Sequence, residues 1–504
     1  MNEDNSYNLV DEPWIPVLMR DGTNRSVSLG DIFADTDGAI ADLALNPYER
    51  VAVFRLLLCI AQAALGPDRL KDDPAWKAAK ADVGPVASEY LKKWHDRFFL
   101  YGPHAFLQPD DAMAVSDDKK TVCDKLVFRL ASGNNSTLFD HGAIGGGRIL
   151  PDAVLALGLL SYQNFSAGGL SGKCLWSGME TAHSLKGAPC REQSMLFTIL
   201  QGDVLLESIW LNLLSASDIR HGLSSDWGRP AWELESLARK TMQGYGKTVL
   251  GHLAPVSRSI KLTNGASSCV LGEAVQYPQL PLWREPMATV KAKDDGSTTY
   301  ISCDPSRLPW RDLTCILEIR GSGGRKGALA LRHLEGLHGD NSFTIWTGGL
   351  YSEKAKEIAT VEWLASFPAS LLEEPSLQRY DNAVAWADRQ RGALRFASKT
   401  YSDLLKIDKA SRFSEPAERI YWDILAQPAN QSLVQNVGSD TYMDDWKGAA
   451  FKAAEEAYRR ACPAMNARQM EAFAQGFAKL RVPGEKKAKA AGGKDFEEEG
   501  GYNV

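Results

Sequence analysis

The segment from Gly168 to Lys173 has the composition of a loop that binds phosphate groups. It reads GGLSGK, one residue shorter than the Gly-x4-Gly-Lys spacing of nucleotide-binding loops. Cys174 follows the lysine, at the position where a serine or threonine hydroxyl would bind Mg²⁺. The residues alone leave three interpretations open: a damaged nucleotide site, a structural turn, or a flexible main-chain surface that contacts another ligand.

Other sequence motifs that carry chemistry are absent. There is no His-Glu-x2-His metal helix, no Gly-x-Ser-x-Gly nucleophile motif and no Gly-x-Gly-x2-Gly dinucleotide fingerprint. The eight histidines lie far apart in the sequence, and the eight cysteines include no Cys-x2-Cys pair. We therefore expect no metal site, no cofactor and no catalytic residue.

Glycine-rich loops with nearby cations remain as candidates for binding. The cations in these loops are Arg148, Lys173, Arg325 and Lys326. Glycine lets the main chain approach a ligand closely and adopt positive φ. Residues 166–169, Ser-Ala-Gly-Gly, would therefore fit a narrow groove that no side chain could enter. A tight turn between two elements explains the same residues equally well.

The charge of the chain limits how it can bind nucleic acid. The 504 residues carry a formal net charge of −6, which disfavours a protein that coats nucleic acid with a general basic field. Contacts would have to come from local basic patches or from neutral main chain. The acidic N-terminus does not resemble a signal peptide, and the best apolar run, from Val53, is too short to span a bilayer. We therefore expect a cytoplasmic protein without membrane contacts.

Hydrophobic patterns divide the chain into two parts that must position these loops. Residues 1–367 mix extended segments and helices without regular alternation, which predicts a large, irregular α+β domain. The pattern predicts strands at 26–33, 313–321 and 343–350, and helices at 48–65 and 76–98, the latter broken near Gly84-Pro85.

The sequence after this domain is of a different kind. In residues 368–482 apolar positions recur every three or four residues, the period of a helix. The helical segments 380–407, 415–428, 444–465 and 467–482 predict an antiparallel four-helix bundle. Residues 483–504 lack apolar content and are predicted to be disordered.

Four stretches, taken in order, resemble a known family. They are LVDEPWIPV (9–17), LLLCIAQAALGP (56–67), FFLYGPHAFLQ (98–108) and GALRFASKTYSDLLK (392–406). Together they resemble the large subunit, CasA, of the type I-E CRISPR surveillance complex Cascade. The resemblance covers essentially the whole chain before the tail, and implies the same two-domain division. It also implies a non-catalytic subunit that inspects the PAM, a short duplex motif beside the target, and helps to open the duplex while a guide RNA reads the target.

The resemblance implies several partners. They are the guide crRNA, double-stranded target DNA with its PAM, and the backbone, handle-binding, small and guide-processing subunits of Cascade. A helicase-nuclease would be recruited in trans onto this subunit after the R-loop forms.

The resemblance also implies how the PAM is read. In the family a glycine loop enters the minor groove, and in this chain it falls on Phe165, Ser166, Ala167, Gly168 and Gly169. The minor groove is about 6 Å wide and its hydrogen-bonding code is degenerate. A flat main-chain segment would therefore read the shape of the groove and exclude the amino group of guanine.

Three further contacts follow from the resemblance. A loop at 132–142 would contact the 5′ handle of the guide and neighbouring subunits through Asn134, Asn135, Phe139, Asp140 and His141. A wedge that splits the first base pair would consist of Tyr351, Ser352, Glu353, Lys354 and Ala355. The DNA backbone would be held by Arg258, Lys261, Lys291 and Lys293.

Two other functions stay open at this point. One is a nucleotide-binding enzyme that uses the loop from Gly168 to Lys173. The other is a purely architectural subunit whose glycine loop contacts no DNA.

Overall fold

The computed structural model describes residues 7–130, 147–170, 172–223, 225–319, 324–335, 341–353, 356–409, 411–427, 437 and 441–482. Some predicted features lie outside these residues: the guide-handle residues Asn134, Asn135, Phe139, Asp140 and His141, the wedge residues Lys354 and Ala355, and the tail 483–504. The chain divides into two compact units, Met1–Glu373 and Glu374–Val504. The boundary expected after residue 367 falls at the end of strand β16 (Lys356–Pro368).

The first unit combines small antiparallel sheets with helices, so the mixed helix-and-strand fold predicted from the sequence is confirmed. Its described sheets have the strand orders β2-β1-β3, β10-β15-β16, β11-β12-β5, β4-β7-β8, β13-β14 and β6-β9. The strands are β1 Ile15–Met19, β2 Asn24–Val27, β3 Ile40–Leu43, β4 Met113–Ala114, β5 Thr121–Val122, β6 Gly169–Leu170, β7 Cys174–Trp176, β8 Met179–Glu180, β9 Ser184–Leu185, β10 Phe197–Gln201, β11 Arg258–Lys261, β12 Ser268–Glu273, β13 Val290–Ala292, β14 Thr298–Tyr300 and β15 Ser342–Glu353.

The described helices of this unit contribute many residues to its hydrophobic core. They are α1 Leu29–Ala34, α2 Pro47–Arg69, α3 Asp73–Ala78, α4 Val83–Trp94, α5 Asp152–Phe165, α6 Leu205–Leu211, α7 Ala216–Asp218, α8 Val249–Leu253 and α9 Leu313–Ile316. A 3₁₀ helix, η6, spans Pro189–Ser194.

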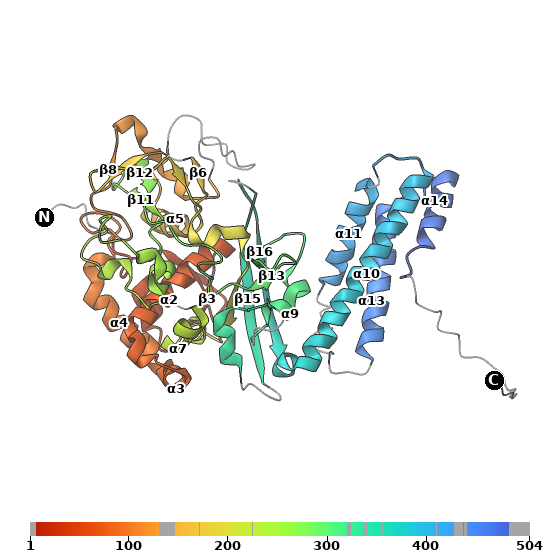
Figure 1. Ribbon diagram of the computed structural model, residues 1–504, viewed down its shortest axis with the longest axis horizontal. Helices are drawn as coiled ribbons and strands as arrows, with labels where there is room; N and C mark the ends of the chain where they lie inside the picture. Colours follow the sequence, from red (N-terminus) through yellow and green to blue (C-terminus); the bar gives the residue numbers. More distant parts are fainter. Residues whose placement is uncertain are drawn as a thin grey trace, which may run out of the picture. The chain divides into compact units, whose positions relative to one another are not determined.

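Helix α2 lies inside the first unit (Figure 1) and packs against α4, α5, α8 and β15. Its first turn is capped by Glu49, whose carboxylate accepts hydrogen bonds from the main-chain N–H and the side-chain amide of Asn46. Among the described residues, α2 is the one helix long and apolar enough to cross a membrane, and 72% of that window is buried inside the protein. Such burial is expected of a core helix.

A buried ion pair ties α2 to distant parts of the chain. The Nη1 atom of Arg55 lies 2.7 Å from Oε1 of Glu285, and the two side chains are 0% and 2% exposed. Arg55 Nε also donates to Oδ1 of Asn164 in α5, at 3.1 Å, and Nη2 donates to the carbonyl oxygen of His252 in α8. One guanidinium group therefore joins two helices and the segment before β13.

Two predicted strands are wrong. At 26–33 only the first two residues belong to a strand, because Ser28 and Asp31 cap the start of helix α1. The Asp31 N–H donates to Ser28 Oγ at 3.0 Å, and the Ser28 N–H donates to Asp31 Oδ2 at 2.9 Å. At 313–321 the chain instead begins as the short helix α9. The strand predicted at 343–350 is confirmed within β15, as is the helix at 48–65 within α2.

The helix predicted at 76–98 is interrupted earlier than expected. A 3₁₀ turn at Ala79–Asp82 separates α3 from α4, whereas Gly84 and Pro85 lie in the first turn of α4. The missing N–H of proline costs nothing there, because the first N–H groups of a helix have no intrahelical acceptor.

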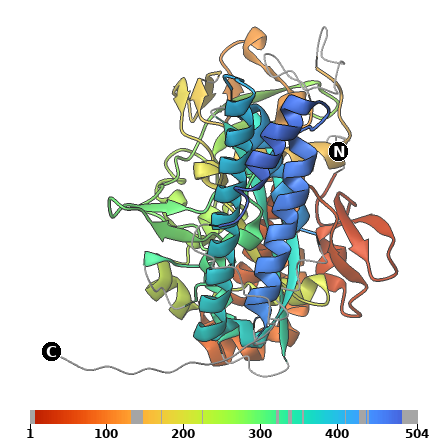
Figure 2. The same cartoon turned by 90° about the vertical axis from the view of Figure 1, so that its right-hand side faces the viewer.

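The described part of the second unit is helical. Its helices are α10 Glu374–Leu404, α11 Ser411–Leu425, α13 Tyr442–Ala461 and α14 Ala467–Phe477. Helix α10 packs against the other three and α11 packs against α13, and the helices run side by side in both views (Figures 1 and 2). The buried rings of Tyr401 and Tyr458 meet edge to face between α10 and α13.

Removing one partner of the buried ion pair should destabilise the first unit strongly. Glu285→Gln leaves the Arg55 charge buried without a counter-charge, and we expect a loss of about 3–5 kcal/mol of unfolding free energy. Chemical denaturation followed by tryptophan fluorescence measures this loss. Glu89→Gln is the control, because Glu89 forms an ion pair with Lys92 at 2.7 Å whose side chains are 74% and 72% exposed, and it should cost less than about 1 kcal/mol. Equal losses would contradict the role of the buried pair.

Candidate nucleic-acid interface

The predicted PAM loop, residues 165–169, leaves the C-terminus of helix α5. Phe165 is 1% exposed, and its ring packs against two other aromatic side chains. Ser166 is fully buried. These two side chains therefore do not reach the surface, which corrects their inclusion in a DNA-facing surface. The accessible chain begins at Ala167 and extends to Leu170, whose side chain is 79% exposed.

Three consecutive carbonyl oxygens fix the path of this loop. Phe165 O accepts from Arg191 Nη1 at 3.1 Å, and Ser166 O accepts from the Ala188 N–H at 2.9 Å. Ala167 O accepts from Arg258 Nη2 at 3.0 Å. Strand β6 then pairs with β9, so that Gly169 lies opposite Leu185. The main chain is thus held from one side and stays accessible on the other.

The two glycines of the loop are required for different reasons. A Cβ atom on Gly168 would lie 2.8 Å from the nitrogen of Gly187 and 3.0 Å from the oxygen of Leu185, so packing against main chain excludes a side chain. Gly169 has φ +115° and would meet no atom within 4 Å. Its conformation therefore requires glycine, while the space beside it is open.

The local fold contradicts the nucleotide-binding alternative. A P-loop joins a strand to the N-terminus of a helix, whereas this chain runs from helix α5 through β6 into strand β7. Lys173 forms an ion pair with Glu180, and Cys174 is fully buried. The described residues on both sides of position 171 therefore lack the helix N-terminus on which such phosphate binding depends.

Two of the cations predicted to hold DNA make contacts inside the protein instead. Arg258 is 4% exposed and donates to the carbonyl oxygens of Ala167 and Lys186, at 3.0 and 2.8 Å. Burial lowers its pKa from the ordinary arginine value. Lys261 donates to the carbonyl oxygen of Gly102 at 3.4 Å and lies 3.9 Å from the Asp110 carboxylate. Arg258 thus positions the glycine loop, and Lys261 is paired within the protein.

The other two predicted cations lie on an exposed hairpin formed by β13 and β14. Lys291 is in β13, opposite Thr299 of β14, and Lys293 follows at the start of the turn. Both lysines are exposed. The geometry leaves both ammonium groups in solvent, where a phosphate group could approach them.

The predicted wedge begins at the tip of the long hairpin of β15 and β16. The Tyr351 hydroxyl donates to Oε1 of Glu353 at 3.1 Å, and this hydrogen bond raises the pKa of Tyr351. The Ser352 N–H donates to Ser194 Oγ at 3.1 Å, which ties the wedge strand to the 3₁₀ helix η6. The described part of the wedge therefore presents an aromatic ring whose hydroxyl is held by a carboxylate.

The residues that sequence reasoning missed belong to this 3₁₀ helix and its neighbour Ala188. Arg191, Gln193 and Ser194 contact the glycine loop, the lysine hairpin and the wedge hairpin respectively. Their partners lie 26 to 158 positions away in the chain, so no spacing rule points to them. Pro189 is the one local signal, since it favours the start of a helical turn.

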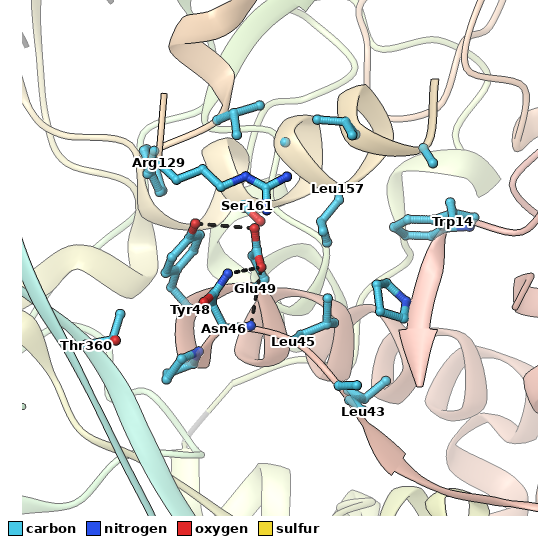
Figure 3. A pocket seen from close by; sticks show the side chains of 18 of the residues that line it. Trp14, Leu43, Leu45, Asn46, Tyr48, Glu49, Arg129, Leu157, Ser161 and Thr360 are labelled. Atoms are coloured by element: carbon cyan, nitrogen blue, oxygen red, sulfur yellow. Dashed lines mark hydrogen bonds between the residues drawn. The ribbon is translucent and has the colours of Figure 1, made fainter. Parts of the chain in front are cut away.

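A cavity of about 740 Å³ lies between the C-terminal end of β3, the N-terminal end of α2, helix α5 and strand β16 (Figure 3). Its wall includes the buried Glu49, which accepts from Asn46 and, at 3.3 Å, from the Tyr48 hydroxyl. Burial raises the pKa of Tyr48. The described lining contains neither histidine nor cysteine for acid–base or nucleophilic chemistry.

Side chains of the types that can bind metals are dispersed over the part of the chain that the structure describes. Among the residues that the structure describes, no group of three or more His, Cys, Asp or Glu side chains is arranged to hold a metal ion. All eight cysteines are buried and none forms a disulfide.

Comparisons with known proteins agree with this architecture. The model of the family described as CRISPR-associated protein Cse1 matches residues 8–463. A CRISPR-associated protein CasA/Cse1 of Thermus thermophilus is 27% identical, over 93% of this chain and 95% of the relative.

Solved structures have the same fold. A crystal structure of Thermus thermophilus CasA matches with a TM-score of 0.74 and 24% identity, over 94% of this chain and 98% of that one. Thermobifida fusca Cse1 matches with a TM-score of 0.77 and 20% identity, over the same shares. A chain of a structure described as a CRISPR RNA-guided surveillance complex matches with a TM-score of 0.72 and 16% identity, over 94% of this chain and 99% of that one.

Loss of the Arg258 guanidinium should loosen the glycine loop. Arg258→Gln removes the donors to the Ala167 and Lys186 carbonyl oxygens, so we expect amide hydrogen exchange at residues 168–170 to accelerate by about tenfold or more. Lys261→Gln, on the same strand, should change exchange there by less than about twofold. Unchanged exchange in the Arg258 variant would show that its hydrogen bonds do not hold the loop.

Proposed function

The chain belongs to the CRISPR-associated Cse1 family, and we propose that it is the non-catalytic large subunit of a type I-E CRISPR RNA-guided DNA surveillance complex. In this proposal it recognises the PAM from the minor groove, helps to unwind the duplex and supports R-loop formation. The observation that carries the proposal is the glycine loop, in which accessible main chain at Ala167–Gly169 is held from behind by the buried Arg258. Family membership and the overall fold support the same reading.

The minor-groove role follows from the size and chemistry of the loop. A groove about 6 Å wide admits main chain without bulky side chains, and only guanine adds an amino group to its floor. The open space beside Gly169 is where a groove wall would fit. The path of the loop is fixed by hydrogen bonds to its carbonyl oxygens. The loop would therefore lose little conformational entropy when it binds the groove, and it would discriminate by shape.

Electrostatics support a localised contact. The chain carries a net charge of −6, so its overall field does not attract DNA. The exposed Lys291 and Lys293 supply positive charge on one hairpin, and we assign them to the DNA backbone. Arg258 and Lys261 are not part of this assignment, because both are engaged within the protein.

The wedge is assigned to the tip of the β15–β16 hairpin. Tyr351 would stack on the base pair next to the PAM, and its hydrogen bond to Glu353 orients the ring. Unstacking one step costs on the order of a few kcal/mol, which groove contacts and heteroduplex formation must offset. Ser352, Lys354 and Ala355 complete the proposed wedge.

The remaining roles rest on the family. Asn134, Asn135, Phe139, Asp140 and His141 would contact the 5′ handle of the guide crRNA and neighbouring subunits. The helical unit would be a four-helix bundle of the complex, and the helicase-nuclease would be recruited onto this subunit in trans. The complex would work in the cytoplasm.

Adding a side chain at Gly169 should weaken recognition of the PAM. In the reassembled complex, Gly169→Asp places a carboxylate where the groove wall would lie, and we expect affinity for PAM-containing duplex to fall by about tenfold or more. Gly22→Asp is the control, because Gly22 also has positive φ (+84°) and open space around it, lies in the β1–β2 turn and changes the charge equally. Binding to a library with a randomised PAM gives both affinity and preference. Equal binding by the two variants would favour the purely architectural subunit.

Neutralising the lysine hairpin should reduce the salt dependence of binding. If Lys291 and Lys293 each contact one phosphate, the double Gln variant lowers the slope of log K against log salt by about 0.9 per contact. The exposed Lys71 and Lys77, both changed to Gln, serve as the control of equal charge. An identical slope for the two double variants would remove the hairpin from the interface.

A further inference from the structure

One short segment, Ala188–Ser194, contacts all three elements assigned to DNA. It contains the 3₁₀ helix η6, which packs against both α5 and β15. None of its residues belongs to the motifs that carried the family resemblance. Hydrogen bonds or ion pairs join it to the loop, the wedge hairpin and the lysine hairpin.

The contact with the glycine loop is made on two carbonyl oxygens. The Ala188 N–H donates to Ser166 O at 2.9 Å, and Arg191 Nη1 donates to Phe165 O at 3.1 Å. Arg191 is 9% exposed. A movement of the loop main chain would therefore change the hydrogen bond that the buried Arg191 guanidinium group donates to it.

The same guanidinium nitrogen reaches the wedge hairpin. Arg191 Nη1 lies 2.6 Å from Oε1 of Glu357, which is the second residue of β16. The Arg191 and Glu357 side chains are 7% and 16% exposed, so water screens the pair only weakly. Nη2 and Nε of Arg191 are also buried and donate to no group among the described residues. These two nitrogens can donate to an acceptor that moves within hydrogen-bonding distance.

Ser194 makes the second link to the wedge. Its hydroxyl accepts from the N–H of Ser352, at 3.1 Å, and donates to the Ser352 carbonyl oxygen at 3.3 Å. Both strands of the hairpin are therefore attached to η6 near their tip, β15 through Ser194 and β16 through Arg191.

Gln193 links η6 to the lysine hairpin. Its Oε1 atom accepts from the N–H of Tyr300 at 3.0 Å and from the Thr299 hydroxyl at 2.5 Å. Thr299 lies directly opposite Lys291 in the hairpin. Gln193 and Ser194 both have positive φ, 54° and 50°, a conformation that residues other than glycine keep only where the surroundings impose it.

We propose that Arg191 is a positioning residue that couples the glycine loop to the wedge hairpin, so that occupation of the groove and opening of the duplex are linked through the Arg191–Glu357 pair. This inference rests on the proposed function. Arg191 touches no DNA in this scheme: it acts on Phe165 O at one end and on Glu357 at the other. Gln193 and Ser194 keep η6 in place between the two hairpins.

The coupling separates two steps that can be measured in the complex reassembled with guide RNA. Binding to a PAM-containing duplex that does not match the guide reports the loop alone. Opening of a matched duplex is followed with a fluorescent base analogue beside the PAM. Glu357→Gln keeps the Arg191 bond to the loop, so it should slow opening by about tenfold and change PAM binding by less than about twofold. Arg191→Met should impair both steps, and the double variant should open no more slowly than Arg191→Met alone.

Asp42→Asn is the matched control. Asp42 pairs with Arg50 at 2.7 Å, and the side chains are 19% and 6% exposed. Arg50 also packs on Trp346 of β15, so a general disturbance of that strand would appear in the control too. We expect Asp42→Asn to lower the thermal midpoint about as much as Glu357→Gln without slowing opening.

The outcomes are distinct. Opening rates that are equal in the Glu357→Gln complex and the parent would overturn the coupling while leaving PAM recognition intact. Opening rates that fall equally in the Glu357→Gln and Asp42→Asn complexes would also overturn the coupling. A parent complex that neither prefers a PAM nor opens matched duplex would overturn the proposed function itself, and the coupling with it. Arg191→Lys, which keeps the charge, replaces Arg191→Met if the latter does not assemble.

Discussion

Buried carbonyl oxygens need hydrogen-bond donors, and this requirement governs the segment that leaves helix α5. Phe165, Ser166 and Ala167 each have a carbonyl oxygen that accepts a hydrogen bond from a distant part of the chain, and the donors are Arg191, Ala188 and Arg258. Two of these donors are buried arginines, whose charge strengthens the hydrogen bonds. The loop therefore has its shape only when the Ala188–Ser194 segment and strand β11 are packed against it. A rigid main-chain surface is the result.

This constraint explains how an acidic chain would recognise DNA. The sequence resemblance predicts that Arg258 binds phosphate. In the structure its guanidinium group instead donates to carbonyl oxygens of the protein, at Ala167 and Lys186. The burial that lowers its pKa also removes it from solvent. In the proposed function, the shape of the main chain would discriminate between sequences, and the lysines of one exposed hairpin would attract the DNA backbone. Such a division would give selectivity without a large basic field, which would also bind unrelated nucleic acid.

The sequence predicted the mixed fold and the family, because long amphipathic helices and the order of apolar motifs are local or linear signals. The strand predicted at 26–33 was wrong because the capping signal of Ser28 and Asp31 was not recognised. These two residues form a capping box that starts helix α1. The sequence could not distinguish Gly168 from Gly169, since one is required by packing and the other by φ. It gave no indication of Arg191 either, because a residue that bridges two distant elements has no periodicity or spacing of its own.

The central claim is that main chain at residues 167–169 reads the minor groove, and changing one atom group on the DNA tests it most directly. Replacing guanine by inosine in a disfavoured PAM removes the amino group from the minor groove and leaves the major-groove edge as it was. We expect the reassembled complex to bind the substituted duplex about as well as a favoured one. Continued rejection of the inosine duplex, together with sensitivity to changes on the major-groove edge of the same base pair, would contradict it.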